Sequence, residues 1–285
     1  MSTTIKALSL AIATMLVLMT SPISLGQQGT SVYEGDWPSW AGSSNASRYS
    51  PLDQITAENV EDLEIAWRWS TQGFGPGTDF VNPSTPLEID GVLYANVGTT
   101  RNVVALDATS GQVLWMYRYD EGTRFDEAPR KGAGRGVSYY NNGEKSRIFD
   151  ISPGYQLVSL DPATGIPDPS FGEDGLVDLY VGVRNGDDPR FAYPDIGISA
   201  PPFIMNDVIV VGAAHRTGGR PRAKLNTKGD IRGFDVHSGE LLWTFHTIPA
   251  RGEYGYESWI SGNDITGNSG VWAAISGDPE LGHVY

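Results

Sequence analysis

The sequence predicts an all-β protein in which short four-stranded sheets repeat as the blades of a β-propeller. Three observations favour this fold class. Short runs rich in β-branched and aromatic residues recur along the chain, 35 Gly and 18 Pro are spread between these runs, and one turn motif occurs three times. Many strands joined by many turns need such a distribution of Gly and Pro. After residue 30 no stretch shows a long helical period, which disfavours a helical bundle.

The turn motif is clearest in residues 105–115 (ALDATSGQVLW) and 233–243 (GFDVHSGELLW), where a small residue precedes Asp, Gly and Trp at a fixed spacing. A degenerate third copy begins at Ser159 and has Pro169 in place of the Trp. We expect the Asp to bond to the local backbone and the Gly to adopt a left-handed conformation, so that each copy marks one sheet. The tryptophans would then lie flat between neighbouring sheets.

Ten runs are expected to form the strands of these blades, because each is short, apolar and bounded by turn residues. In chain order they are residues 63–69, 91–97, 103–108, 113–119, 147–153, 157–162, 201–214, 231–236, 241–247 and 271–276. One helical turn is expected before the first of them, where Thr56 is followed by Asn59. The copies of the turn motif are unevenly spaced, so the blades carry unequal insertions, and such loops are where a propeller holds its active site.

Composition excludes several classes of protein. The formal net charge is -14, so the chain lacks the basic surface that nucleic-acid binding requires. The chain has no Cys, which excludes disulfides, thiol nucleophiles and cysteine-ligated metal or haem sites. Residues 1–26 combine Lys6, an apolar stretch and small residues before Gln27, and they predict a signal peptide. We therefore expect a periplasmic or secreted protein, in which any membrane association would not run through this chain.

Five stretches resemble the quinoprotein dehydrogenases, which are eight-bladed propellers that bind pyrroloquinoline quinone (PQQ). The turn motif resembles the family's tryptophan docking motif, and the stretches are residues 37–67, 134–140, 152–165, 230–249 and 266–285. The glucose-dehydrogenase-like branch is the most similar. Because eight blades need roughly twice this length, residues 27–285 are expected to form the N-terminal part of the propeller, about its first three to four blades. Such a fragment is expected to be inactive alone, because its sheet edges would be exposed.

The resemblance implies oxidation of a sugar or other alcohol by hydride transfer to PQQ, with a calcium or magnesium ion at the quinone and a quinone or cytochrome as electron acceptor. It places Arg135 against the quinone and carboxylate oxygens of PQQ, Trp272 beneath the quinone ring and Ser199 at a PQQ carboxylate. Lys131 and His215 are weaker candidates for positions near the substrate.

The sequence also departs from the alcohol-oxidising branch. That branch has a calcium-ligating Glu where this chain has Thr217, and no carboxylate occurs from Val211 to Asn226. Its vicinal cysteine pair is missing too, so a sugar or polyol is favoured over methanol or ethanol. The metal ligands are therefore left unknown. The family's catalytic Asp is expected beyond Tyr285, so no general base is assigned to this chain.

Two alternatives stay open at this point. The first is a non-catalytic propeller of the same repeat family that serves as a scaffold for outer-membrane protein assembly. The second is a lectin-like propeller, which rests on fold analogy alone. The discriminating feature is whether Arg135, Ser199 and Trp272 converge, because an enzyme requires their convergence and a scaffold does not.

Overall fold

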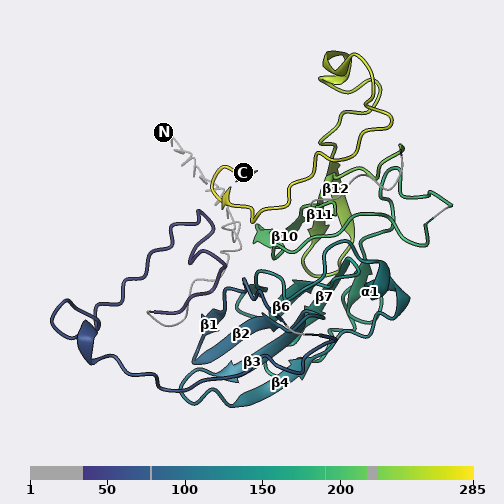
Figure 1. Cartoon of the computed structure of the whole chain (residues 1–285). Helices are drawn as coiled ribbons and strands as arrows, with labels where there is room; N and C mark the ends of the chain where they lie inside the picture. Colours follow the sequence, from purple (N-terminus) through teal and green to yellow (C-terminus); the bar gives the residue numbers. More distant parts are fainter. Residues whose placement is uncertain (1–34, 78, 190, 217–223) are drawn as a thin grey trace, which may run out of the picture.

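The structure is a computed structural model that describes residues 35–77, 79–189, 191–216 and 224–285. Its strands form three four-stranded antiparallel sheets, each ordered as in the sequence, and a two-stranded sheet near the C-terminal end (Figure 1). We call the four-stranded sheets blades 1, 2 and 3. The predicted fold class, an all-β propeller, is confirmed. The predicted signal peptide, residues 1–26, lies outside the described residues.

The bounds of the elements are as follows. Blade 1 consists of β1 (Leu87–Ile89), β2 (Val92–Val97), β3 (Asn102–Asp107) and β4 (Val113–Tyr117). Blade 2 consists of β5 (Ser138–Asn141), β6 (Ser146–Ile151), β7 (Gln156–Leu160) and β8 (Leu176–Asp178). Blade 3 consists of β9 (Phe203–Met205), β10 (Val208–Val211), β11 (Ile231–Asp235) and β12 (Leu241–Phe245). The two-stranded sheet pairs β13 (Gly277–Asp278) with β14 (His283–Val284), and the short helices are η1 (Val60–Asp62), α1 (Thr123–Glu127) and η2 (Tyr256–Trp259).

The three turns of the repeated motif have the same geometry. Gly111, Gly165 and Gly239 have φ angles of 72°, 70° and 77°, and each donates its amide hydrogen to the carbonyl of the Asp four residues earlier. In each turn an Asp carboxylate oxygen accepts both the amide and the hydroxyl hydrogen bond of the Ser or Thr three residues on. The prediction of a left-handed Gly and an Asp that bonds locally is therefore confirmed.

The register of the strands explains the small residue that opens the motif. Ala105 in β3 lies directly opposite Trp115 in β4, and Gly233 in β11 lies opposite Trp243 in β12. A Cβ atom added to Gly233 would overlap the Trp243 indole ring. A larger side chain at either position would therefore lift the tryptophan off its own sheet.

The tryptophan of one sheet rests on the turn of the next. The Trp115 indole NH donates to the Pro162 carbonyl at 2.8 Å, and a Cβ atom on Gly165 would lie 2.6 Å from Trp115 Cδ2. Trp67 repeats this arrangement on the turn of blade 1, with a 3.0 Å hydrogen bond to the Ala108 carbonyl. Trp115 thus lies between blades 1 and 2, as predicted.

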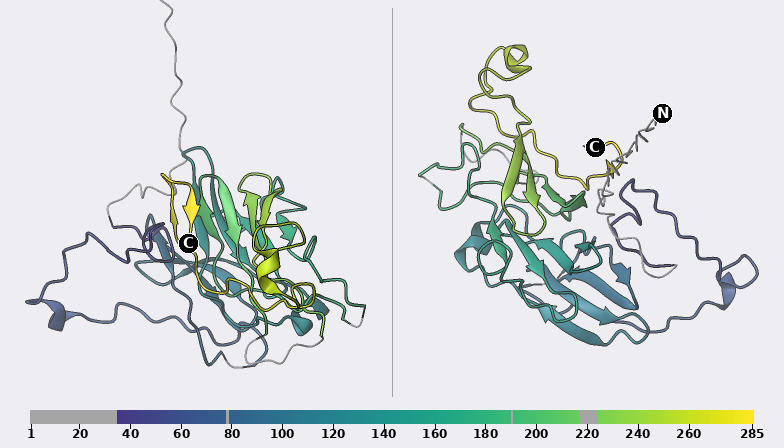
Figure 2. Two further views of the ribbon diagram at one scale, coloured as in Figure 1. Left: turned by 90° about the horizontal axis from the view of Figure 1, so that it is seen from above. Right: turned by 180° about the vertical axis from the view of Figure 1, so that it is seen from behind.

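The core of the molecule lies between successive sheets. One buried cluster joins blades 1 and 2 and includes Leu87, Val103 and Ile148. Another joins blades 2 and 3 and includes Phe149 and Ile209. Figure 2 shows the sheets from two further sides, with the long segment before blade 1 and the segment around η2 extending away from them. The sheets therefore stack face against face, and the first strands of blades 2 and 3, β5 and β9, contact each other.

Some predicted strands differ from the structure. Residues 63–69 and 271–276 are not strands, and the expected strand at residues 201–214 is divided into β9 and β10 by a turn at Asn206 and Asp207, both with positive φ. Within the described residues, neither of the two extended runs has a neighbouring strand with which to form a ladder, and apolar character alone does not make a strand. The single helical turn predicted after Thr56 is present as η1, preceded by Asn59.

Candidate functional site

The candidate site is built from segments that precede the first strand of each sheet. Thr85 precedes β1, Arg135 precedes β5, Ser199 precedes β9 and Trp272 precedes β13. These equivalent segments are far apart in the sequence, but backbone hydrogen bonds and a ring contact bring them together. The three residues that the sequence predicted for cofactor binding all belong to this set.

Backbone hydrogen bonds join these segments into one continuous layer. The Arg135 amide donates to the Ser199 carbonyl at 2.9 Å, while the Arg135 carbonyl accepts from the Thr85 amide at 3.0 Å. Further along, Gly197 and Ala214 exchange a pair of hydrogen bonds, and the Ala213 amide donates to the carbonyl of Val271 at 2.8 Å. The position of Arg135 is therefore set by its neighbours on both sides and not by its own loop alone.

Arg135 and Trp272 are in direct contact. The Arg135 guanidinium carbon lies 5.2 Å from the centroid of the Trp272 ring, which is a cation–π arrangement. The Trp272 side chain is 53% exposed, so the aromatic surface is open to a ligand. Ser199 is half-buried beside this pair, on the strand-like segment that bonds to Arg135. The structure thus brings together the three predicted cofactor-binding residues.

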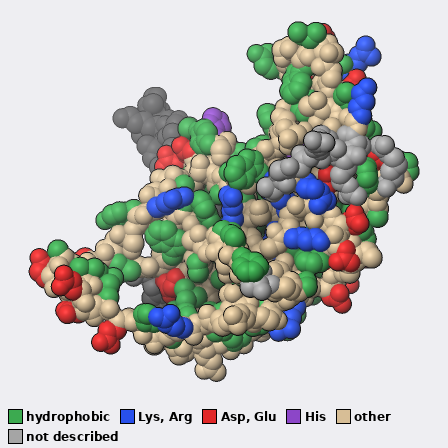
Figure 3. Space-filling view, in the orientation of Figure 1, with side chains coloured by type: hydrophobic (Ala, Val, Ile, Leu, Met, Phe, Trp, Pro, Cys, Tyr) green, Lys and Arg blue, Asp and Glu red, His purple; other side chains and the backbone are tan. Residues whose placement is uncertain are grey.

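A second guanidinium, that of Arg130, belongs to the same region, although no sequence motif marks this residue. Burial, and then the positive charge of Arg135, lower the pKa of Arg130 from its ordinary value, so the two cations are close enough to repel each other. A Cβ atom on Gly197 would lie 3.3 Å from Arg130 Cβ, which places Arg130 against the segment that carries Ser199. Two neighbouring guanidinium groups favour an anionic ligand. Figure 3 shows several Lys and Arg side chains over the middle of this view and acidic side chains mainly at its margins.

The two weaker candidates, Lys131 and His215, have contacts with other groups than Arg135 and Trp272. The Lys131 ammonium donates to the Asp126 carbonyl at 2.7 Å and lies over the Phe125 ring, so it faces α1. His215 Nε2 is 2.9 Å from the Thr227 carbonyl, and its ring packs beside Gly229. His215 follows Ala214, whose backbone is part of the layer, whereas the contacts of Lys131 are with α1. Their proximity to the substrate stays a prediction.

The structure supplies no ligand set for a metal ion within the residues it describes. In that part of the chain, no three His, Asp or Glu side chains are grouped closely enough to hold one. Thr217, which occupies the place of the calcium-ligating Glu, lies outside the described residues. None of the described helices combines the length and the apolar character that a membrane crossing requires.

A buried carboxyl lies behind the site. Asp150, at the end of β6, accepts a 2.9 Å hydrogen bond from the Tyr119 hydroxyl. Burial raises the pKa of Asp150 to about 6, and the nearby positive charge of Arg101 opposes this rise. Because the carboxyl is protonated more readily in the folded protein than in the unfolded chain, its ionisation weakens the folded state.

We expect Asp150→Asn to remove a pH dependence of stability. Between about pH 4 and pH 6 the folded protein retains the Asp150 proton that the unfolded chain has released, so the free energy of unfolding falls as the pH rises. The loss amounts to on the order of 3 kcal/mol for a pKa difference of about 2 units. Urea unfolding of both proteins from pH 4 to pH 7 measures it. The variant is expected to gain stability relative to the natural protein across this range, and parallel profiles would contradict the assignment.

The fold and the site define a class: a β-propeller in which the segments that precede the first strands bring two guanidinium groups and an indole ring into one region. The family described as "Glucose/ethanol/alcohol dehydrogenase, beta-propeller domain" matches residues 37–285, and the chain belongs to this family of PQQ-dependent dehydrogenases.

Individual relatives agree with this family. The chain is 28% identical over 271 residues to the glycerol dehydrogenase large subunit of Gluconobacter oxydans (strain 621H), covering 91% of this chain and 34% of that one. It is 30% identical over 230 residues to the quinoprotein glucose dehydrogenase of Escherichia coli (strain K12), covering 75% and 27%. The solved quinohemoprotein alcohol dehydrogenase ADHIIG of Pseudomonas putida HK5 superposes with a TM-score of 0.65 at 26% identity, covering 87% and 33%. The chain spans about a third of the length of these relatives.

Proposed function

We propose that the protein carrying this chain is an exported PQQ-dependent dehydrogenase that oxidises a sugar or other alcohol and passes the electrons to a quinone or a cytochrome. The observation that carries this proposal is the contact of Arg135 with the ring of Trp272, which is 53% exposed, in a layer that also holds Ser199. Membership of the family supports the cofactor and the reaction type. Export rests on the sequence of residues 1–26.

The residues at the site fit PQQ, which is a flat tricarboxylate. The guanidinium of Arg135 offers several N–H donors to quinone and carboxylate oxygens, and the nearby Arg130 adds positive charge. The Trp272 ring provides an apolar floor for a planar ring system. The Ser199 hydroxyl can donate to a carboxylate. When bound, PQQ supplies an electrophilic carbonyl that accepts hydride from the substrate.

The chain's own residues would bind and orient the cofactor and hold charge near it. Because the backbone of Arg135 is fixed between Thr85 and Ser199, this segment need not be ordered when the cofactor binds, and little backbone conformational entropy is lost. The fixed cation would also stabilise negative charge that develops on a quinone oxygen. We assign no general base to this chain. The calcium or magnesium ion that the resemblance implies stays a prediction.

The comparisons do not favour the non-catalytic scaffold. The relatives reported above are named as dehydrogenases, and the three residues that discriminate an enzyme from a scaffold converge. Glycerol, glucose and alcohol are named for different relatives, so we propose the substrate class only as a sugar or other alcohol.

We expect Arg135→Ala to weaken PQQ binding by about 10- to 100-fold, which corresponds to the loss of one or two charge-assisted hydrogen bonds. The measurement is titration of the apoprotein, made from its complete gene, with PQQ and Ca²⁺, followed by dye reduction with aldoses and alcohols. Arg118→Ala is a matched control, because Arg118 also lies over an aromatic ring, 5.6 Å from the centroid of Phe74, but on an exposed outer part of blade 1. A folded natural protein that binds no PQQ would overturn the proposal.

A further inference from the structure

A fully buried arginine lies directly behind the candidate site. Arg101 is 1% exposed and occupies the turn between β2 and β3 with a φ of 56°, in the left-handed region. An arginine in a turn between two strands is ordinarily solvated, and burial of its charge is costly unless the guanidinium is well bonded. The left-handed backbone adds a further cost for a residue with a side chain. Such a residue is retained in this position only if its contacts offset both costs.

The Arg101 guanidinium holds four backbone carbonyls from three segments. Nε donates to Gly132 at 3.2 Å and Nη2 donates to Arg130 at 2.7 Å. Nη1 donates to Ile151 at 2.8 Å and to Ile198 at 2.6 Å. The acceptors therefore belong to the loop before Arg135, to the end of β6 and to the residue immediately before Ser199.

These contacts concentrate on two of the three segments that carry the predicted cofactor-binding residues, those of Arg135 and Ser199. The loop at residues 130–134 leads directly into Arg135, and Ile198 precedes Ser199. Gly134 leaves room for the guanidinium, since a Cβ atom there would lie 2.9 Å from Arg101 Nε. Asn96 completes the support by accepting a 3.0 Å hydrogen bond from the Gly136 amide with its side-chain oxygen. A single cation thus ties both segments to blades 1 and 2.

We propose that Arg101 is a positioning residue for the PQQ site: it fixes the Arg135 and Ser199 segments relative to each other and thereby sets cofactor affinity. The proposal deepens the function proposed above and rests on it. The planar guanidinium is required because its donors point in fixed, divergent directions, which a lysine ammonium cannot reproduce. Burial lowers the pKa of Arg101, the carboxyl of Asp150 opposes this shift, and the positive charge of Arg130 adds to it, so the buried guanidinium lies close to Arg130.

The test uses Arg101→Lys and Arg101→Gln in the protein made from its complete gene. Arg101→Ala would leave four buried carbonyls unpaired and is expected to prevent folding. For the two milder variants we expect the Kd for PQQ to rise by about tenfold or more. We also expect faster amide hydrogen exchange at residues 132–136 and 197–200 of the apoprotein, because these segments lose their shared anchor.

Arg147→Lys is the matched control. Arg147 is also a buried arginine that donates to a backbone carbonyl of the next blade, that of Val236, but it lies in the junction of blades 2 and 3 and contacts neither cofactor segment. We expect this variant to lower the melting temperature while its folded form keeps the natural Kd for PQQ. The comparison therefore separates positioning of the site from general stability.

Each outcome decides the proposal. If the Arg101 variants melt at a lower temperature but keep the natural Kd and the natural exchange rates at both segments, Arg101 has only a structural role and the proposal is wrong. Failure of both variants to fold would also overturn it, because Arg101 would then determine the stability of whole sheets. If the natural protein binds no PQQ, the proposed function fails, whereas faster exchange confined to the two segments would still show that Arg101 positions them.

Discussion

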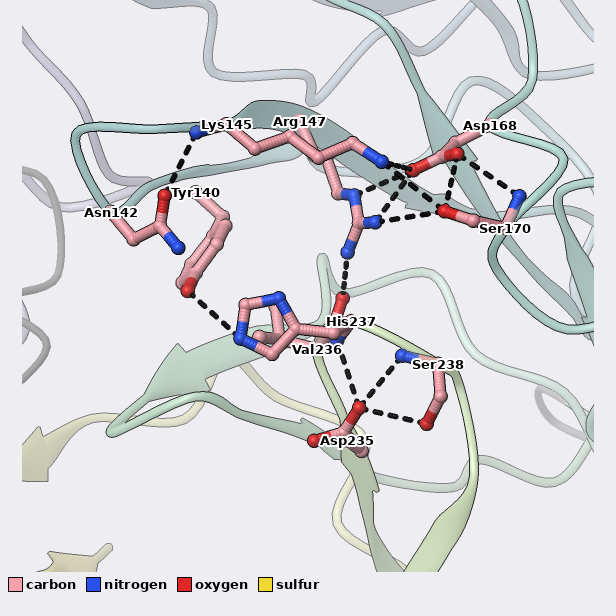
Figure 4. A network of polar contacts seen from close by, with 10 residues as sticks. All are labelled: Tyr140, Asn142, Lys145, Arg147, Asp168, Ser170, Asp235, Val236, His237 and Ser238. Atoms are coloured by element: carbon pink, nitrogen blue, oxygen red, sulfur yellow. Dashed lines mark hydrogen bonds and ion pairs between the residues drawn. The ribbon is translucent and has the colours of Figure 1, made fainter.

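Arg147→Ala is expected to lower the free energy of unfolding by about 3 to 5 kcal/mol, because it breaks a buried ion pair and also removes the donor to the Val236 carbonyl. Figure 4 shows the network, in which Arg147 of β6 faces Asp168 and also reaches the backbone of blade 3. Arg147 Nε and Nη2 contact Asp168 Oδ2 at 2.8 and 2.6 Å, and Nη1 donates to the Val236 carbonyl. One side chain therefore joins blade 2 to the turn of blade 3.

The pKa of Asp168 determines how the stabilisation by its ion pair with Arg147 depends on pH. Burial by itself raises the pKa of Asp168, but hydrogen bonds from Lys145 and Ser170 and the charge of Arg147 outweigh it and hold the pKa well below its ordinary value. The stabilisation is therefore present above the pKa of an unfolded Asp and is lost as the pH falls through the folded value. The Arg147→Ala variant is expected to lose less stability than the natural protein on acidification.

Lys145→Ala is the control for this effect. Lys145 also contacts Asp168, at 2.6 Å, but its side chain is 47% exposed, so its removal is expected to cost at most about 1 kcal/mol. Urea unfolding at pH 7 and at about pH 2, below the pKa of an unfolded Asp, measures both variants. Equal costs for Arg147→Ala and Lys145→Ala would contradict the assignment of Arg147 as the blade junction.

Two features could be predicted from the sequence. They are the conformation of the repeated turns and the positions of the strands that are rich in aromatic and β-branched residues. Asp, Gly and Trp at a fixed spacing determine a turn through contacts within a few residues, so a single sequence suffices. The short strands β1, β5 and β8 were missed, since three or four residues carry too little alternation to distinguish a strand from a loop. Their pairing comes from neighbouring strands. Blade 2 illustrates the same limit. Its copy of the turn motif has Pro169 where the other copies have Trp, and the ring that packs against Gly239 in the turn of blade 3 is that of Phe171.

The candidate site could be predicted in part. Arg135, Ser199 and Trp272 were found through a family resemblance, and their convergence required the structure. Arg101 and Arg130 were missed because nothing local marks either residue as buried or close to Arg135. Arg101 acts through carbonyls at residues 130, 132, 151 and 198, and separations of this size leave no pattern in the sequence near it.

Trp115→Ala is expected to lower the free energy of unfolding by about 3 kcal/mol, the lower end of the range for removal of a large aromatic side chain, because Trp115 is half-buried. The variant loses the contact with Gly165 and the hydrogen bond to the Pro162 carbonyl, so it separates blade 1 from the turn of blade 2. Thermal and urea unfolding measure the effect. A cost below about 1 kcal/mol would contradict the role of the tryptophan as the contact between blades.

Trp243 provides the sharpest comparison, because it has the same motif position but a different environment. It is 37% exposed, and all five residues of β12 are exposed, so within the described residues no turn covers it. The turns of blades 1 and 2 cover Trp67 and Trp115. If the Asp-x-x-x-Gly turn of a further blade covers Trp243 in the same way, Trp243→Ala will lower the free energy of unfolding as much as Trp115→Ala does. We expect this result in the protein made from its complete gene. A much smaller cost there would contradict continuation of the propeller past blade 3.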